Sequence, residues 1–313
     1  MASDFPCSNE TTTDVAWKIG VGSGYLALFA FYMFPQVFVL TTTTQKTLLS
    51  QPSYKIMLAT ACVDMVQLTF VLALPGWLSL WRVVYCPSAT WMKVIGHINM
   101  VLAFVYTMLR TTLSINRILQ LGRPKLCMRL FDGTKAWYWV LWCFVFGFVL
   151  ALGATGSAPL YFYDVDAGVW KFLWIKNNLL NVSHMFNNIY SLFMVSITEP
   201  TIIVLLRKKG FKVTSDISKV QRRITIQTII VNIVFDVSHI FYLLVSYTPL
   251  KNVSCIGIVG EVLWATVHGS NGYSYLFLNR SVQEKIKNFL TKMECKKKQN
   301  ALFSLSTQVT PVS

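Results

Sequence analysis

Charged residues are scarce in this chain, and acidic residues are the scarcest of them. Only 13% of the 313 residues are Asp, Glu, Lys or Arg, with 13 acidic against 28 basic side chains, while 54% are hydrophobic. Soluble domains carry about 25% charged residues, and disordered or coiled-coil chains carry more. The composition therefore excludes these classes, and with a mean hydropathy of +0.50 it indicates a membrane protein.

The chain also lacks the motifs of common catalytic and metal-binding sites. Its seven Cys form no CxxC pair, and the sequence contains no HExxH and no Walker A loop. A net charge of +15 would suggest nucleic acid in a soluble protein, but in a membrane protein it poses the question of which side carries the charge. We therefore expect no enzyme activity, no cofactor, no metal and no nucleic-acid partner.

Seven runs of residues are long and apolar enough to cross the roughly 30 Å of bilayer hydrocarbon, which takes about 20 helical residues. They are Ile19–Leu40, Ile56–Trp81, Val94–Ile115, Ala136–Ala154, Asn187–Leu206, Ile224–Tyr247 and Ile256–Leu278. The expected fold class is an all-α membrane protein with a seven-transmembrane helix bundle over residues 19–278. Residues 1–18 contain no basic region and no cleavage site, so we expect an uncleaved extracellular N-terminus.

The distribution of Lys and Arg predicts the orientation. With the N-terminus outside, the inner loops and the tail hold 21 of the 28 basic residues and the outer segments hold 6, while Arg110 lies within a span. Cytoplasmic loops are enriched in Lys and Arg, so we expect the N-terminus outside and the C-terminus inside. The sequons at Asn9, Asn181 and Asn252 then fall on the outer side and are predicted glycosylation sites.

The segment after the last span has the pattern of a helix on the membrane surface. Val282, Ile286, Phe289 and Leu290 repeat at helical spacing with lysines between them. Residues 279–292 are therefore predicted to form an amphipathic eighth helix on the inner leaflet, in contact with membrane lipids. Cys295 follows as a palmitoylation candidate, and residues 293–313 are expected to be a disordered cytoplasmic tail.

Three cysteines lie in predicted outer segments, where the compartment is oxidising. Cys7, Cys86 and Cys255 could form one disulfide with one thiol left over. The sequence leaves all three pairings open.

Ionisable residues inside a span are costly and mark functional hypotheses. At a rise of about 1.5 Å per residue, Asp64, Arg110 and Glu199 all lie about 10–12 Å from the inner face, in one intramembrane polar layer. An unpaired arginine there would cost several kcal/mol, so we expect Arg110 to pair with Asp64 or Glu199. Such a pair is either a static salt bridge or a latch that rearranges on activation.

A second polar group lies in the outer half of the predicted bundle. Glu261, Trp264 and His268 are spaced to share one helical face, and the complete hypothetical ligand pocket comprises His97, Asp236, His239, Glu261, Trp264 and His268. Two alternatives stay open. The side chains could hydrogen-bond between helices only, or Asp236 and His239 could form an intrahelical pair.

Four short motifs occur together at the ends of the predicted spans. They are Ser-Tyr-Lys-Ile-Met at 53–57, Asn116-Arg117 at the end of the third span, Leu-Cys-Met-Arg-Leu-Phe-Asp-Gly at 126–133, and His-Gly-Ser-Asn-Gly-Tyr-Ser-Tyr-Leu-Phe-Leu-Asn at 268–279. In combination they resemble the nematode serpentine receptor class T family, a branch of the rhodopsin-like G-protein-coupled receptors, over about residues 15–292.

The resemblance implies a chemoreceptor that binds an external small molecule and signals through a heterotrimeric G protein. It implies coupling at Asn116 and Arg117, and a location in the plasma membrane and, for the family, in sensory-neuron cilia. Asn116 replaces the acidic residue that rhodopsin-like receptors carry there, and Gly272 replaces the proline of their Asn-Pro-x-x-Tyr motif. The alternatives are a transporter or ligand-gated channel subunit, or a receptor-shaped orphan that does not couple.

The charge asymmetry yields a test of topology. Asn181→Gln and Asn252→Gln should each remove a glycan when the protein is made in a glycosylating membrane system. As a control, a sequon engineered near Thr214, in the loop predicted to be cytoplasmic, should stay unmodified. A glycan at the engineered site would contradict the orientation with the N-terminus outside.

Overall fold

The computed structural model describes residues 14–83, 90–152, 161–172, 179–209, 216–253, 255–279, 282–284, 286–288 and 291–292. Its helices are α1 (Val15–Thr43), α2 (Lys46–Leu49), α3 (Pro52–Leu68), a π-helical segment (Thr69–Ala73), α4 (Leu74–Leu80), α5 (Thr90–Gly122), α6 (Pro124–Phe131), α7 (Lys135–Leu152), α8 (Leu179–Lys209), α9 (Asp216–Tyr247), a 3-10 turn (Pro249–Asn252) and α10 (Ile256–Leu278). The strands are β1 (Tyr161–Asp164) and β2 (Val169–Phe172).

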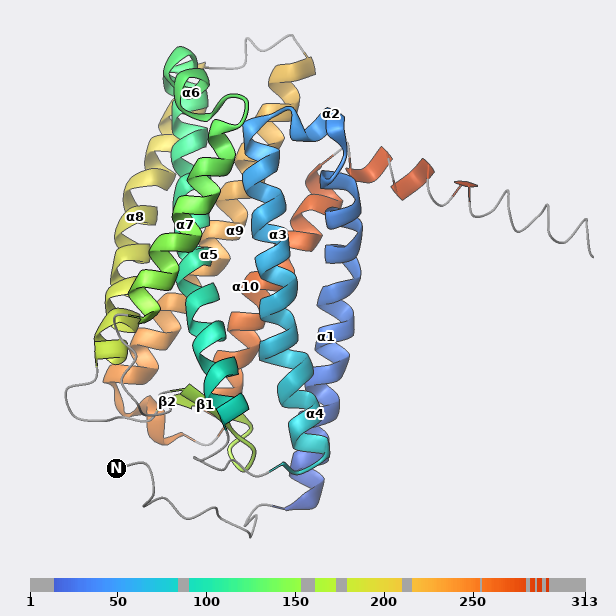
Figure 1. Cartoon of the computed structure of the whole chain (residues 1–313), viewed down its shortest axis with the longest axis vertical. Coiled ribbons are helices and arrows are strands. Elements are labelled where there is room, and N and C mark those ends of the chain that lie inside the picture. Colours follow the sequence, from blue (N-terminus) through green and yellow to red (C-terminus); the bar gives the residue numbers. More distant parts are fainter. Residues whose placement is uncertain are drawn as a thin grey trace, which may run out of the picture.

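Seven long rods run side by side along the molecule: α1, the continuous α3–π–α4 rod, α5, α7, α8, α9 and α10 (Figure 1). Each coincides with one of the seven predicted spans. The rods α5, α8 and α9 extend beyond the apolar runs by about two turns at one end. A helix can continue into polar residues because its backbone N–H and C=O groups bind one another within the helix.

Hydropathy alone identifies fewer spans than the fold contains. Among the described residues, five helical stretches are long and apolar enough to cross a membrane, and α6 with α7, bent by 68°, makes a sixth. Helix α10 is not among them, although its bounds match the seventh predicted span. Glu261, His268 and Asn271 lie in it and are almost fully buried, which indicates that the polarity of α10 faces the bundle and not the lipid.

Three prolines mark the ends and the irregular part of these rods, whereas Pro35 and Pro200 lie inside α1 and α8. Pro52 and Pro124 stand in the first turn of α3 and α6, where a missing N–H costs nothing. Pro75 follows the π-helical segment Thr69–Ala73 and lies in the first turn of α4. A π-bulge offsets the backbone hydrogen bond that this proline cannot make, so the second rod stays continuous.

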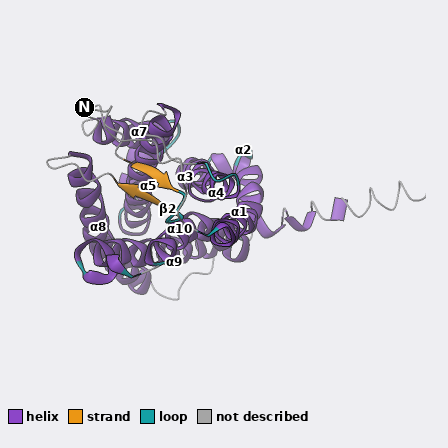
Figure 2. Ribbon diagram, turned by 90° about the horizontal axis from the view of Figure 1, so that it is seen from below, coloured by secondary structure: helices purple, strands orange, loops and turns teal. Residues whose placement is uncertain are grey.

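A two-stranded antiparallel hairpin, which the sequence did not predict, covers one end of the bundle between α5 and α10 (Figure 2). Its register pairs Tyr161 with Phe172 and Tyr163 with Trp170. The turn closes at Gly168, whose φ of +71° favours glycine. We call this end outer, following the charge rule, and the end that carries α6 inner.

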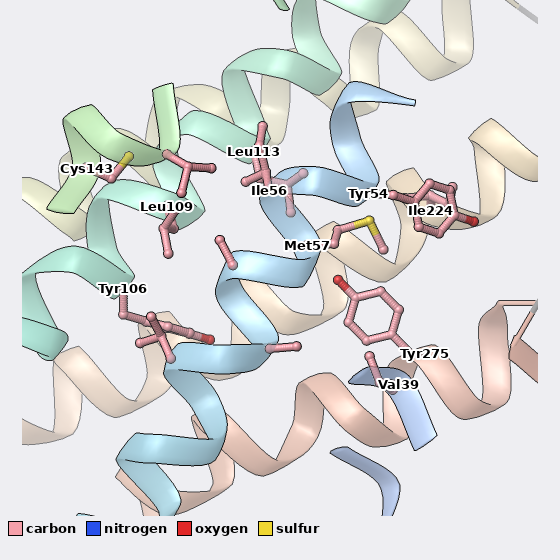
Figure 3. Close-up of a cluster of buried hydrophobic side chains, with 14 of the residues drawn as sticks. Val39, Tyr54, Ile56, Met57, Tyr106, Leu109, Leu113, Cys143, Ile224 and Tyr275 are labelled. Carbon is pink, nitrogen blue, oxygen red and sulfur yellow. The ribbon is translucent and has the colours of Figure 1, made fainter. Parts of the chain in front are cut away.

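One cluster of buried hydrophobic residues lies in the inner half, around α3, α5 and α10, and a second lies beneath the hairpin in the outer half. Tyr54, Ile56, Met57 and Tyr106 are at most 1% exposed, and Figure 3 shows the Tyr275 hydroxyl turned toward the Met57 sulfur. The tail belongs to the same core. The described residues at 282–284, 286–288 and 291–292 are helical, and Val282 is fully buried in this cluster with Ile286 packed against it.

Two of the sequence motifs meet at the inner end. The Lys55 ammonium donates a hydrogen bond to the carbonyl of Gly133, which has a positive φ of 60°. Phe131 is buried and stacks on Trp139 with ring centroids 5.5 Å apart. The Tyr-Lys-Ile-Met and Leu-Phe-Asp-Gly segments therefore hold α6 against α3 and α7.

The glycines of α1 provide a matched stability test. A Cβ on Gly22 would lie 2.9 Å from both the Gly76 carbonyl oxygen and Leu80 Cγ, whereas one on Gly20 would meet nothing within 4 Å. We expect Gly22→Ala to lower the melting temperature of the detergent-solubilised protein. Gly20→Ala should leave it unchanged or raise it, because Ala favours helix by about 0.5–1 kcal/mol over Gly. Equal melting temperatures would contradict the close packing of α1 on α4.

Candidate functional site

Asp64 of α3 is the centre of a buried hydrogen-bond network. Its Oδ1 lies 2.8 Å from His268 Nδ1, and its Oδ2 accepts a hydrogen bond of 2.7 Å from Asn271 Nδ2. Asn271 Nδ2 also donates to the Tyr106 hydroxyl at 3.1 Å. All four side chains are at most 1% exposed. The carboxyl is therefore held by two residues of α10, and one of them, Asn271, also binds Tyr106 of α5.

Arg110 of α5 is bound by amides and not by carboxylates. Its guanidinium donates to Asn232 Oδ1, to the Thr228 carbonyl at 3.3 Å and to Asn271 Oδ1 at 3.4 Å. The expected direct pair with Asp64 or Glu199 was wrong: no salt bridge joins these side chains in the described part of the chain. The sequence argument considered only opposite charges, and neutral amide oxygens take that role here.

Each of the two carboxylates is nevertheless linked to Arg110 through one asparagine. Asn271 joins Arg110 to Asp64, while Asn232 accepts from Arg110 and donates to Glu199 Oε1. Asn232 also donates to Ser114 Oγ at 3.1 Å. The predicted polar layer is thus one continuous network across α3, α5, α8, α9 and α10, with the charges separated by amides.

An aromatic cluster lies against the outer side of this network. The His268 ring makes edge contacts with Tyr106 and Trp264, at centroid distances of 4.5 Å and 4.9 Å. Trp264 also contacts His239 at 6.0 Å and Tyr242 at 6.3 Å. His268 therefore belongs to both groups: its Nδ1 binds Asp64 and its ring packs on Trp264.

Glu261 binds the hairpin, and only one of its two carboxyl oxygens has a hydrogen-bond partner among the described residues. Oε1 accepts a 3.1 Å hydrogen bond from the backbone N–H of Trp170, whose indole N–H donates to the Phe70 carbonyl at 3.2 Å. Oε2 is buried and has no hydrogen-bond partner among the described residues. The carboxyl is 4% exposed, so it ties β2 to α10 and leaves one acceptor unused.

The hairpin is fastened to several helices at once. Lys18 of α1, itself 1% exposed, forms a 2.6 Å ion pair with Asp166 in the turn. The Tyr25 hydroxyl donates to the Gly168 carbonyl at 2.7 Å. The Tyr163 hydroxyl shares a 2.7 Å hydrogen bond with Ser79, and burial raises the pKa of this phenol well above its ordinary value, so it keeps its proton.

The other residues of the predicted pocket are less tightly grouped. His239 Nδ1 lies 2.8 Å from the Phe235 carbonyl, so the imidazole satisfies its own helix and does not pair with Asp236. Asp236 is half-buried on α9 with Oδ1 lacking a partner among the described residues. His97 is half-buried in the second turn of α5.

At the inner end, Arg117 points into the protein. It is 1% exposed, and it donates to Gln120 Oε1 at 2.8 Å and to Met57 Sδ at 3.9 Å. Asn116 accepts from Ser53 Oγ at 2.8 Å and donates to Cys127 Sγ at 3.5 Å. Arg117 is therefore not a solvent-exposed topological anchor in this conformation.

Close packing explains why position 272, where the related motif has proline, is a glycine. A Cβ there would lie 3.1 Å from Gln36 N and from Pro35 Cγ of α1. Beside it, Gln36 donates to the His268 carbonyl at 2.6 Å. A glycine at this position therefore allows α10 to approach α1 closely.

Several predicted modification sites lie outside what the structure describes. Asn9, Cys7, Cys86 and Cys295 are not described, and Asn181 and Asn252 are described by backbone only, in the first turn of α8 and in the 3-10 turn. Cys255 is exposed and has no disulfide partner among the described residues.

Sequence reasoning missed the amides, Tyr106 and the buried Lys18. Asn232, Asn271 and Gln36 each interrupt an apolar run, and that interruption was the available signal. An uncharged polar side chain in a span needs a partner as an ionised one does, though at a smaller cost.

Comparison with known proteins identifies the class of this arrangement. The crystal structure of squid rhodopsin matches with a TM-score of 0.72 at 15% identity, over 92% of this chain and 89% of that one. This match shows the fold, a seven-helix bundle of the G-protein-coupled receptor type. The comparison with curated proteins returns no match.

The family follows from the sequence model. Residues 2–300 match the model of the serpentine type 7TM GPCR chemoreceptor family Srt. The chain belongs to this family, and it is a multi-pass membrane protein and a G-protein-coupled chemosensory receptor, not an enzyme. A ligand and a G protein are therefore its partners.

The amide bridges give the second stability test. Asn232→Leu should lower the folded yield and melting temperature more than Arg110→Leu. The first change removes one of three acceptors from a guanidinium that cannot lose its charge, and losing a hydrogen bond to a buried charge costs about 2 kcal/mol. The double variant should recover part of the loss, because the charge is gone. Equal effects of both single changes, or strict additivity, would refute the bridging role of Asn232.

Proposed function

We propose that the receptor binds an external small molecule in the outer half of the bundle, beneath the hairpin and against the cluster formed by Trp264, His239, Tyr242 and His268. Glu261, Asp236 and His97 border this region. Binding there alters the network around Asp64, and the change reaches the G protein through Arg117 at the inner end.

The observation that carries this proposal is the position of His268. Its ring is packed on Trp264, on the side from which a ligand would come, while its Nδ1 is held 2.8 Å from Asp64. A ligand that displaces Trp264 therefore changes the packing of the ring that anchors Asp64. Asp64, in turn, shares Asn271 with Arg110, so the effect can reach α5, the helix that carries Arg117.

The inner end supports a coupling role for Arg117. The guanidinium is buried against Gln120 and Met57 and its Nε has no partner among the described residues. A buried, incompletely bonded cation is costly, so a conformation in which Arg117 meets a G protein would relieve part of that cost. Asn116, the residue before Arg117, is bonded to Ser53 of α3 and Cys127 of α6. These bonds hold the part of α5 that carries Arg117 in place.

The receptor's surroundings are part of the proposal. We assign it to the plasma membrane, with sensory-neuron cilia as the setting that family resemblance suggests. Asn9, Asn181 and Asn252 would carry glycans outside. Cys295 would carry a palmitoyl group beside the surface helix. The buried side chain of Val282 supports packing of the first turn of that helix against the bundle.

The test is ligand-stimulated nucleotide exchange on a G protein, with agonists found by screening. Trp264→Ala should lower agonist potency at least about tenfold, the effect of roughly 1.4 kcal/mol of lost contact, at unchanged surface expression. Trp142→Ala is the matched control, because that indole is 53% exposed on α7. Equal potency of both variants and the wild type would contradict the pocket.

Arg117→Ala in the same assay should abolish exchange while agonist binding persists. Preserved exchange would remove the coupling role from Arg117. A wild-type protein that binds agonist but never exceeds empty membranes in exchange would identify a non-coupling orphan and overturn the signalling half of the proposal.

A further inference from the structure

An apolar groove opens on the outside of the bundle between α1 and α10. Its volume is about 460 Å³, within the usual range of ligand pockets. The walls carry almost no polar surface and are formed by Ala16, Trp17, Gly20, Val21, Gly24, Tyr25 and Leu28 of α1 and by Cys255, Ile258 and Val262 of α10. Both helices begin at the outer end, so the groove lies at the depth of the outer leaflet.

The floor of the groove is a row of small residues that no helix of the bundle covers. Ala16, Gly20 and Gly24 are exposed at intervals of four, and a Cβ on either glycine would meet nothing within 4 Å. Gly22, on the adjacent face, is instead used to pack α1 on α4. From Ala16 to Leu28 the groove runs for about 18 Å, close to the hydrocarbon depth of one leaflet.

Tyr25, which lines the groove, and Glu261 bind the hairpin at positions two residues apart. The tyrosine lines the groove and is 2% exposed, with its hydroxyl bonded to the hairpin at Gly168. Glu261 stands on α10 between the groove residues Ile258 and Val262, accepts from the Trp170 N–H two residues beyond Gly168, and has a buried Oε2 without a partner among the described residues. An apolar slot open to lipid is thus lined by a tyrosine that binds the same hairpin as a carboxyl with an unused buried acceptor.

We propose that this groove is the membrane-side entry and binding site for a single-chain amphiphile, whose apolar chain lies along α1 and whose hydrogen-bond-donating head, an amine or an alcohol, reaches Glu261 Oε2 past Tyr25. This deepens the proposed function, since it names the ligand class and its route to the region beneath the hairpin. Movement of Tyr25 releases its bond to Gly168 and so reports the ligand to the hairpin.

A single chain fits the groove better than a second copy of the receptor does. A helix with its side chains is about 10–12 Å across and would have to rest on both α1 and α10 at once, whereas the glycines leave a slot between them. Contact with a helix of a second receptor would also supply no hydrogen-bond donor to the unpartnered oxygen of Glu261. A donor head satisfies that oxygen, which is otherwise a buried acceptor without a hydrogen bond among the described residues.

The experiment measures binding of tritiated dodecylamine, dodecanol and dodecyl methyl ether to the full-length receptor in phosphatidylcholine nanodiscs, with empty nanodiscs as background. The amine and the alcohol should bind saturably, and the ether, which has no donor, at least tenfold more weakly. Gly24→Leu fills the groove and should weaken amine binding at least tenfold. Ser23→Leu, also exposed and one residue away but not lining the groove, should change it less than threefold. Glu261→Gln should reduce the preference for the amine over the alcohol.

Several outcomes would overturn the proposal. They are no saturable binding of any probe, equal binding of alcohol and ether, or equal effects of Gly24→Leu and Ser23→Leu. Resonance energy transfer between fluorescently labelled receptors tests the second-copy alternative. If Gly24→Leu abolished this transfer and no probe bound saturably, the groove would be assigned to a second copy. The readout needs neither agonist nor G protein, so its failure leaves the Trp264 pocket and its exchange assay untouched, and the converse also holds.

Discussion

Arg110 carries a charge that it cannot lose, at the centre of a bundle that lies in hydrocarbon. The guanidinium is 4% exposed and meets no carboxylate directly; Asn232, Asn271 and the Thr228 carbonyl accept its hydrogen bonds. Because a buried cation in a membrane is costly without acceptors, the bonds of the two Nη atoms hold α5 in register with α9 and α10, while Nε has no partner among the described residues. Much of the arrangement of the inner bundle follows from this requirement.

The use of amides in place of direct ion pairs has a consequence for signalling. Removing one partner of a buried salt bridge leaves an unpaired charge and strongly destabilises the protein. A side-chain amide donates to one neighbour and accepts from another, so its hydrogen bonds can form again in more than one arrangement. Asn271 lies between Asp64 and Arg110, and Asn232 lies between Arg110 and Glu199. In the proposed signalling step, the network would rearrange while the amides keep these charges hydrogen-bonded.

The outer half of the molecule is built on a different constraint, the closure of the bundle by the hairpin. Lys18, Tyr25, Ser79 and Glu261 each bind it, and they come from three separate rods. The region around Trp264 is thus enclosed from the outer end, which is consistent with an entry route through the side of the bundle between α1 and α10.

The sequence predicted the seven rods well, because each is a run of apolar residues of the length that a bilayer requires. It even defined α10 correctly, where hydropathy alone does not reach a spanning helix. The hairpin escaped prediction, since two strands of four residues give too short a pattern to separate from a loop. Spacing on α10 grouped Glu261, Trp264 and His268 on one face, and in the structure Glu261 and His268 are buried while Trp264 is half-buried.

The contacts within the network could not be read from the sequence. Depth placed Asp64, Arg110 and Glu199 in one layer, and the structure links them through Asn271 and Asn232, but depth does not give rotation about the helix axis. Rotation determines that His268 meets Asp64 and that Arg110 meets Asn232. Fully buried Arg117 was likewise unpredictable, because a basic residue at the inner end of a span is ordinarily explained by the charge rule alone.

The central claim is that His268 couples the outer aromatic cluster to Asp64. A double-mutant cycle between Trp264→Phe and Asp64→Asn, measured on agonist potency in nucleotide exchange, tests it most directly. The account predicts a coupling free energy of at least about 1 kcal/mol in the wild-type background and none in a His268→Phe background. Additive effects in the wild-type background, or a coupling that survives His268→Phe, would contradict it.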